Sequence, residues 1–171
     1  YKWWVFGAIG IGTFFSAMDQ GSVNIALPRI ESHFQTDLPT VQWVVVGYAL
    51  AISVLLLPMG RLGDVFDRKT VYMAGLVLFV AGALVAGLSP SVHMVIGAKV
   101  LQGAGSAMIQ GNAMAAVISV FPGTERGKVL GLHVSVVGVG IIVGPALGGA
   151  LVSAFDWRAV FFSSVGGGLT A

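Results

Sequence analysis

The chain has no cysteine among its 171 residues, and charged residues make up only 9% of it. The absence of cysteine excludes disulfides, thiol catalysis and cysteine metal sites. Soluble globular domains carry about 25% charged residues, so this low charge, with 56% hydrophobic residues, indicates a membrane protein. A net charge of only +2 gives no reason to expect nucleic-acid binding. His33, His93 and His133 are too scattered to predict a metal site, and we expect no cofactor.

Long apolar runs occupy most of the chain, and a helix needs about 20 apolar residues to cross a bilayer. Five runs reach that length, and a sixth begins at Trp157 but is incomplete at Ala171. The predicted spans are 3–28, 41–60, 70–88, 94–121, 129–154 and 157–171. The sequence therefore predicts an all-α membrane protein, and we expect further spans to follow.

The basic residues gather on one side of these predicted spans. That side carries Lys2, Arg61, Arg68, Lys69, Arg126 and Lys128, whereas the other carries only Arg29 and Arg158. Cytoplasmic loops are enriched in Lys and Arg. We therefore predict a multi-pass protein of the plasma membrane, with its N-terminus and the loops 61–69 and 122–128 in the cytoplasm.

Two pairs of segments suggest an internal repeat. Residues 16–21 read SAMDQG and residues 106–111 read SAMIQG, while 66–73 (FDRKTVYM) resembles 155–162 (FDWRAVFF). The matches place the first predicted span over the fourth and the third over the sixth. Three spans is an odd number, so the second copy must enter the membrane from the opposite side. Inverted repeats of this kind are typical of secondary transporters, whose sites lie near the membrane midplane. Coincidence among small and apolar residues is the alternative.

Polar residues form a stripe on each of two predicted spans. The first stripe comprises Thr13, Ser16, Gln20 and Asn24, with Asp19 beside it, and the second comprises Lys99, Gln102, Ser106 and Gln110. Neither stripe would face lipid, so both imply a shared cavity or a polar seam between helices. An acidic residue at the membrane centre costs at least about 2.5 kcal/mol, which favours a functional role for Asp19. Desolvation disfavours the charged form of a carboxylate, which can then take up a proton. The alternative is an Asp19–Lys99 ion pair that only holds two helices together.

The fifth predicted span contains the segment GVGIIVGPALGG, residues 138–149. Gly140, Gly144 and Gly148 are four residues apart, which lets another helix approach closely. Pro145 removes a backbone hydrogen bond and is expected to kink the helix. The segment is either a bend at which two bundles move or a site of tight packing.

Residues 60–70, GRLGDVFDRKT, are predicted to form a short charged loop, in which Gly60 and Gly63 permit a tight bend. We expect Asp64 to bind helix N-terminal amides or a basic residue. Arg68 and Lys69 are expected to pair with acidic groups at neighbouring helix ends. Glu125 and Arg126 lie on the same predicted face and are candidate partners.

Four of these segments resemble signatures of the major facilitator superfamily. GRLGDVFDRK is similar to its loop 2–3 signature, although Val65 and Asp67 replace the usual basic residue and glycine. KVLQGAGSA (99–107) resembles the span 4 signature, with Lys99 at the arginine position, and GVGIIVGPALGG resembles the antiporter signature of span 5. MDQGSVNIALPRI (18–30) is similar to the span 1 signature of the fourteen-span drug:proton antiporters, and DWRAVFF to the opening of their sixth span.

The resemblance implies an N-terminal six-helix bundle built from 3+3 inverted repeats, without its C-terminal partner bundle. It implies a secondary transporter that exports lipophilic or cationic small molecules in exchange for protons by alternating access. Asp19, Gln20, Asn24, Lys99, Gln102 and Gln110 would then serve protons and substrate. Gly60, Gly63, Asp64, Arg68 and Lys69 would serve gating, and Gly140, Gly144, Pro145 and Gly148 would form the antiporter segment. A symporter for a small metabolite and a non-transporting membrane subunit are the alternatives. No residue pattern predicts an enzyme.

Overall fold

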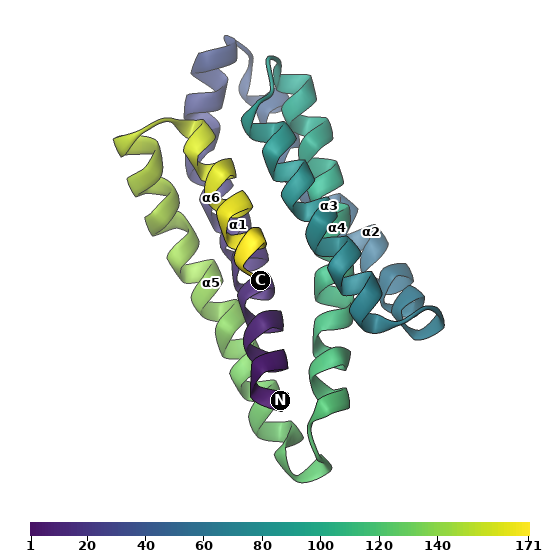
Figure 1. Cartoon of the computed structure of the whole chain (residues 1–171). Coiled ribbons are helices and arrows are strands. Elements are labelled where there is room, and N and C mark those ends of the chain that lie inside the picture. The colour runs from purple at the N-terminus through teal and green to yellow at the C-terminus, as the bar shows by residue number, and fades with distance from the viewer.

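The computed structural model describes all 171 residues, and every regular element in it is helical. The elements are α1 (Lys2–Phe34), α2 (Leu38–Val65), α3 (Arg68–Gly87), α4 (Val92–Val120), the 3₁₀ helix η1 (Gly123–Glu125), α5 (Arg126–Ala154) and α6 (Trp157–Thr170). Figure 1 shows them as one elongated bundle in which consecutive long helices run in opposite directions. The prediction of an all-α fold is confirmed.

The helix starts follow from short polar residues just ahead of them. The side chain of Asp67 accepts a hydrogen bond from the Thr70 amide at 3.1 Å, and Ser91 accepts one from the Met94 amide at 3.3 Å. Asp156 caps α6 in the same way through the Trp157 amide, at 2.7 Å. These oxygens satisfy amides that would otherwise lack a partner at a helix N-terminus.

Four helical segments are long and apolar enough to cross a membrane: α2, α3, α4 and 123–154, which joins η1 to α5. α1 has 33 residues, so its length suffices, but the polar residues between Thr13 and Asn24 lower its hydropathy. α6 has 14 residues, fewer than a crossing needs. The sequence had predicted five full spans, of which the first is now seen to be a long helix with a polar centre.

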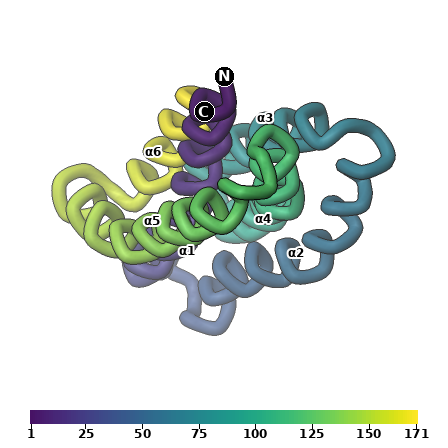
Figure 2. The backbone as a smooth tube through the Cα atoms, turned by 90° about the horizontal axis from the view of Figure 1, so that it is seen from below, coloured from purple at the N-terminus to yellow at the C-terminus, as the bar shows by residue number.

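The helices pack in a pattern that agrees with two repeats of three. α1 packs along α5, α4 packs along both α2 and α3, and α6 contacts α1 and α3. Viewed along the bundle, α1 and α4 lie towards the middle, with α2 and α5 on opposite flanks (Figure 2). The first and fourth helices, which carry the two polar stripes, are therefore the inner pair.

The core is divided into two apolar clusters with a polar layer between them. One cluster includes Val23 and Ile30 of α1 with Val95 of α4, and the other includes Ile9 of α1 and Ile109 of α4. Asp19 and residues 99–106 fall between the two clusters along their helices. The apolar clusters close off the ends of the bundle around a polar middle.

The structure corrects the interpretation of residues 60–70 as a loop. α2 continues as a helix through Val65, and only Phe66 and Asp67 connect it to α3. No glycine in the chain has a positive φ, so Gly60 and Gly63 do not form a tight bend. A side chain at Gly60 would instead begin 3.4 Å from the Gly111 carbonyl of α4. At Gly63 a side chain would overlap the Asn112 side chain of α4, and small residues in membrane helices allow such close approach.

Candidate functional site

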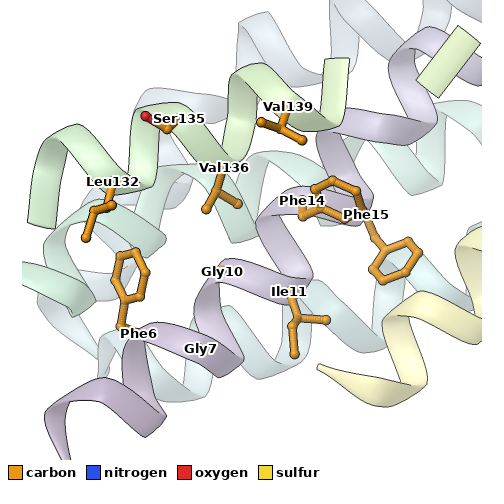
Figure 3. A pocket seen from close by; sticks show the side chains of 10 residues that line it. All are labelled: Phe6, Gly7, Gly10, Ile11, Phe14, Phe15, Leu132, Ser135, Val136 and Val139. Carbon is orange, nitrogen blue, oxygen red and sulfur yellow. The ribbon is translucent and has the colours of Figure 1, made fainter. Parts of the chain in front are cut away.

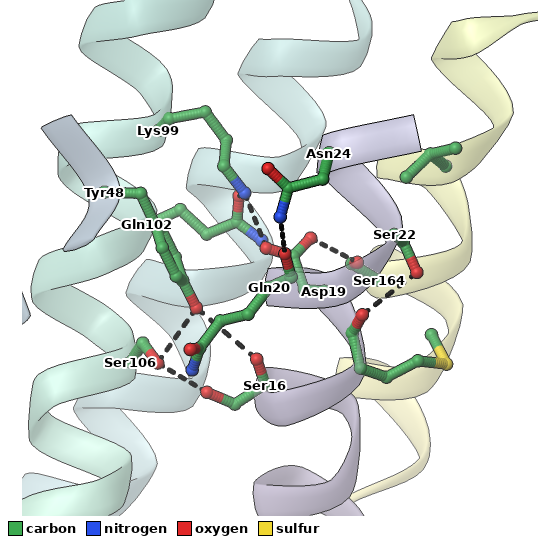
Figure 4. Close-up of polar contacts among 12 residues, drawn as sticks. Ser16, Asp19, Gln20, Ser22, Asn24, Tyr48, Lys99, Gln102, Ser106 and Ser164 are labelled. Carbon is green, nitrogen blue, oxygen red and sulfur yellow. Dashed lines mark hydrogen bonds and ion pairs between the residues drawn. The ribbon is translucent and has the colours of Figure 1, made fainter. Parts of the chain in front are cut away.

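Asp19 lies at the point where α1, α4 and α6 meet, and its side chain is fully buried. One carboxylate oxygen, Oδ2, accepts a hydrogen bond from Lys99 Nζ of α4 at 2.5 Å. The other, Oδ1, accepts one from the Ser164 hydroxyl of α6 at 2.8 Å (Figure 4). Both oxygens are thus satisfied, which a buried charge requires.

Lys99 is almost as deeply buried, with 1% of its surface exposed. Besides Asp19, its ammonium donates a hydrogen bond to Gln102 Oε1 at 2.8 Å. It also lies 4.3 Å from the centre of the Tyr48 ring and 5.6 Å from that of Phe161. Cations are attracted to aromatic faces at such distances, so four side chains from four helices stabilise this ammonium.

A second polar group lies one helical turn from Asp19, towards the end of the bundle that holds the N-terminus. The hydroxyls of Ser16 and Ser106 share a hydrogen bond, and Tyr48 Oη donates to Ser106 Oγ at 3.1 Å. Gln110 Nε2 donates to Ser106 Oγ at 2.9 Å and to Ser16 Oγ at 3.3 Å. Ser16 and Ser106 occupy the same position in the two SAM segments, so the repeat units meet at equivalent atoms.

A cavity of about 280 Å³ adjoins the buried ion pair. Its walls come from α1, α2, α4 and α5 and include Asp19, Gln20, Asn24, Tyr48 and Lys99. Asn24 Nδ2 donates to the Gln20 carbonyl of its own helix at 3.1 Å. This bond does not use the side-chain oxygen of Asn24, which can still accept a hydrogen bond. The structure therefore brings Asp19, Gln20, Asn24, Lys99 and Gln102 to one site, whereas Gln110 belongs to the serine group below it.

A larger cavity of about 450 Å³ lies between the first halves of α1 and α5 (Figure 3). Apolar side chains such as Phe6, Phe14 and Val136 form most of its wall, and Ser135 supplies the only polar side chain. It contains no group that can carry a proton or a charge.

The glycines of the fifth predicted span face α1. A side chain at Gly140 would begin 2.8 Å from the Phe14 carbonyl, and one at Gly144 would overlap the Met18 carbonyl. Gly148 packs in the same way against Ser22. The expectation that this glycine face packs against another helix is confirmed, and α1 is that helix. Pro145 packs on the same seam, where its ring leaves no room for a side chain at Gly21.

The charged segment after Gly60 forms local contacts. Arg68 donates to Asp64 through Nε at 3.1 Å and Nη2 at 2.7 Å, and its Nη1 donates to the Ala115 carbonyl of α4 at 3.2 Å. Gly63 lies against the amide group of Asn112 so closely that a side chain there would overlap it. Lys69 forms no ion pair.

Glu125 does not pair with Arg68 or Lys69, so that expectation is wrong. It binds the Lys2 ammonium at 2.6 Å instead. The fold places the start of α1 beside the α4–α5 connection, and Trp3 stacks edge-on against Phe121 there, with ring centres 5.3 Å apart. Arg126 likewise has no acidic partner, and its Nε donates to the Phe121 carbonyl at 3.4 Å.

Three side chains of the site were not identified from the sequence: Tyr48, Phe161 and Ser164. Each lies in an apolar run, where one aromatic or hydroxyl residue does not stand out. The position of Ser164 on the same helical face as the buried Val160 and Phe161 is a signal that α6 turns this face inward. No group of three His, Cys, Asp or Glu side chains is placed to hold a metal ion, and we assign no metal or cofactor site.

Comparison with known proteins identifies relatives along nearly the whole chain. The chain is 32% identical to the riboflavin transporter RibZ of Clostridioides difficile over 170 residues, which is 99% of this chain and 37% of RibZ. It is 34% identical to the multidrug resistance protein Stp of Mycobacterium tuberculosis (91% of this chain, 29% of Stp). It is 36% identical to the tetracenomycin C resistance and export protein of Streptomyces glaucescens (96% of this chain, 30% of that protein). The chain thus spans about a third of the length of these relatives.

The fold is also that of a solved structure. A bacterial homologue of the human lysosomal transporter Spinster, in an inward-facing and unoccupied conformation, superposes with a TM-score of 0.83 at 18% identity. The superposition covers 99% of this chain and 42% of that one. The sequence profile of the major facilitator superfamily matches residues 9–171. Because the relatives are transporters, the prediction that the chain is not an enzyme is confirmed. On the evidence of this match, the chain belongs to the major facilitator superfamily.

Proposed function

We propose that the chain is the N-terminal bundle of a proton-coupled exporter of lipophilic or cationic small molecules, which works by alternating access. The observation that carries the proposal is the buried Asp19 beside a cavity, within reach of three other helices. Intramembrane ionisable groups are functional candidates by default. Two of the relatives are named for multidrug resistance and for export of tetracenomycin C, which supports export as the direction of transport.

In this proposal Asp19 exchanges a proton for the substrate. The carboxylate has two partners that can move independently, Lys99 on α4 and Ser164 on α6. Movement of either helix would change the number of hydrogen bonds that the charged form receives. Gln20 and Asn24 line the cavity next to it and would contact substrate.

We also propose that the cytoplasm lies at the end of the bundle that contains the N-terminus, in the plasma membrane. That end carries six of the nine Lys and Arg residues, whereas the other end carries Arg29 and Arg158. Lys99 is the remaining one and lies in the middle. Such an asymmetry is the usual sign of the cytoplasmic side.

We also propose roles for the segment after Gly60 in gating and for the glycine segment of α5 in holding helices together. Gly60, Gly63, Asp64, Arg68 and Lys69 lie at the proposed cytoplasmic end, where α2 and α3 meet α4. Gly140, Gly144, Pro145 and Gly148 hold α5 tightly against α1. A second bundle following this chain would complete the transporter. The partners of the whole protein would be protons, a small-molecule substrate and lipid.

Uptake or export of a small metabolite is the second candidate, because RibZ is named as a riboflavin transporter. A proton symporter would use the same carboxylate but would move substrate and proton in one direction. The direction of substrate movement under an imposed pH gradient distinguishes the two.

The test is drug efflux from vesicles that contain the full-length protein, driven by an imposed pH gradient. Asp19→Asn keeps the size of the side chain and one acceptor oxygen but removes its titration, so proton-driven efflux should fall to background. Full efflux by this variant would mean that the carboxylate only pairs two helices.

Asp37→Asn is a matched control, because Asp37 is an exposed carboxylate between α1 and α2. The hydrogen bond from the Thr40 side chain lowers the pKa of Asp37, so this group stays charged throughout the neutral range. Its removal should leave the pH dependence of efflux unchanged. An unchanged circular dichroism spectrum and monodisperse elution of Asp19→Asn, with lost coupling, would show that the variant is folded.

A further inference from the structure

The surroundings of the Lys99 ammonium have the composition of a binding site for an organic cation. A carboxylate, an amide oxygen and two aromatic rings surround it: Asp19, Gln102, Tyr48 and Phe161. All four of these side chains are buried, with at most 3% of any one exposed. We call this set the ammonium cage, and Figure 4 labels three of its members, Asp19, Tyr48 and Gln102.

Proteins recognise ammonium groups by combining aromatic faces with negative charge. A structural ion pair needs only the carboxylate and enough hydrogen bonds to satisfy both partners. The Tyr48 ring, 4.3 Å from the ammonium, adds a contact that is specific for a cation. The cage is therefore built for an ammonium group, and in this structure the protein supplies that group itself.

The position of Lys99 permits exchange with a ligand. It is attached to α4, whereas Asp19, Tyr48 and Phe161 come from α1, α2 and α6. Its flexible four-carbon stem allows the ammonium to move without a change in the backbone. Asp19, Tyr48 and Lys99 themselves form part of the wall of the 280 Å³ cavity, so a ligand in the cavity is already next to the cage.

The cavity also offers Lys99 an alternative position. Gln20 and Asn24 line it, and their side-chain amides carry oxygens that accept hydrogen bonds from an ammonium. A displaced Lys99 would therefore have polar partners, whereas a displaced Asp19 would lose both of its hydrogen bonds.

We propose that the Lys99 ammonium is a built-in competitor for the transported cation. Organic monocations with an accessible ammonium group enter the cage, bind Asp19 and the two rings, and displace Lys99 towards Gln20 and Asn24. Neutral molecules of the same shape do not displace it. This inference rests on the proposed function and specifies its substrate class as organic ammonium compounds.

The first test compares binding of benzyltrimethylammonium with that of its neutral isostere, neopentylbenzene, to the full-length protein in nanodiscs. If Lys99 vacates the cage in about one molecule in ten, its removal raises the apparent affinity about tenfold. Lys99→Met should therefore bind the cation about tenfold more tightly, with no gain for neopentylbenzene. Lys128→Met removes the same charge from an exposed position and should leave both affinities unchanged. Unchanged or weaker cation binding by Lys99→Met would overturn the proposal.

The second test needs no variant, because Lys99→Met leaves Asp19 buried without its cationic partner and can impair folding. Lysines of the wild-type protein are modified by reductive methylation and quantified by mass spectrometry. Saturating benzyltrimethylammonium should raise modification of Lys99 several-fold, because its amine then reaches water, and should leave Lys128 unchanged. Neopentylbenzene should have no effect on either residue. Unchanged or reduced modification of Lys99 with the cation bound would overturn the proposal.

The two proposals fail separately. Displacement of Lys99 by the cation, without efflux under a pH gradient, would overturn the proposal of proton-coupled export and would support the cage as a binding site. Efflux that depends on Asp19, with no displacement of Lys99, would support the proposed function and would overturn the competitor role of Lys99.

Discussion

The two three-helix repeats meet along several pairs of helices, and two of these seams, α1 against α5 and α2 against α4, are equivalent in the repeat. In the first seam three of the four closely packed glycines are on the outer helix, α5, where side chains at Gly140 and Gly148 would begin 2.8 Å from atoms of α1, and the fourth, Gly21, is on α1. In the second seam both helices carry glycines that face the partner: Gly63 on α2, and Gly103 and Gly111 on the inner helix, α4. A side chain at Gly103 would begin 2.7 Å from the Tyr48 carbonyl, and one at Gly111 would begin 3.0 Å from that of Leu56.

The difference shows that the fold requires the backbones of two helices to approach closely, whichever helix carries the glycines. Without a hydrophobic driving force between helices in lipid, close packing of small residues supplies much of the association. Placing most of the glycines on α5 leaves α1 free to carry side chains such as that of Ser22 on the facing side. The close approach at Gly103 serves the site directly, because it holds the backbone of Tyr48, whose ring faces Lys99.

Each seam also has one hydrogen bond at an equivalent place in the repeat. Ser22 donates to the Gly144 carbonyl at 2.8 Å and to Met18 of its own helix at 2.9 Å. Asn112, ninety residues later, donates to the Met59 carbonyl at 3.0 Å and to Met108 of its own helix at 2.9 Å. The repeats therefore preserve the contact geometry while changing the residue that makes it.

The largest effect is expected when the first seam is broken at its centre. Gly144→Leu places a side chain where the Met18 carbonyl lies, so α5 must separate from α1. Overpacking and lost helix contact together should cost about 3 kcal/mol or more, seen as poor membrane expression or a much lower thermal unfolding temperature.

Gly149→Leu is the matched control on the same helix. A Cβ atom there meets only the Ile25 Cγ2 atom, at 3.9 Å, so the side chain can extend without overlapping α1 backbone and thermal stability should stay near that of the wild type. Equal stability of both variants and the wild type would show that α5 does not pack on α1 as described.

Much of this arrangement could be predicted from the sequence, because it depends on periodicity. The spacing of Ser16, Gln20 and Asn24 on one helix, and of Lys99 and Ser106 on another, predicted two polar faces that meet. The glycine spacing in α5 predicted a packing face. A period along one helix determines which side is buried, whatever lies opposite.

Contacts that depend on which helix lies opposite could not be predicted in this way. The approach of α6 to α1 brings Ser164 to Asp19, and no local pattern determines this partner. Glu125 pairs with Lys2 because the fold, not the sequence order, brings these chain segments together. Gly63 was misread because glycine permits both a bend and a close contact, and only the position of Asn112 decides between them.

A smaller effect is expected from the hydrogen bond of the first seam. Ser22→Ala removes the donor to the Gly144 carbonyl and should cost about 1 kcal/mol, the usual net value of one such bond. Ser53→Ala is the control, because the exposed Ser53 donates only to Ala49 of its own helix, at 2.8 Å. Thermal unfolding of the two variants in the same detergent measures the difference. An equal effect of both substitutions would show that the contact across the seam contributes nothing.

The smallest effect on stability is expected at Asp64, where the seam of α2 and α4 reaches the proposed cytoplasmic end. The side chains of Asp64 and Arg68 are 59% and 39% exposed, and exposed pairs of this kind contribute about 0–1 kcal/mol. Asp64→Asn should therefore leave membrane expression near normal. Transport should nevertheless slow, because Arg68 also binds the Ala115 carbonyl of α4, and loss of its acidic partner changes how firmly α3 is held there. Expression by immunoblot and efflux from the same cells give the two readings. If expression falls in parallel with transport, the segment has a structural role and its assignment to gating is wrong.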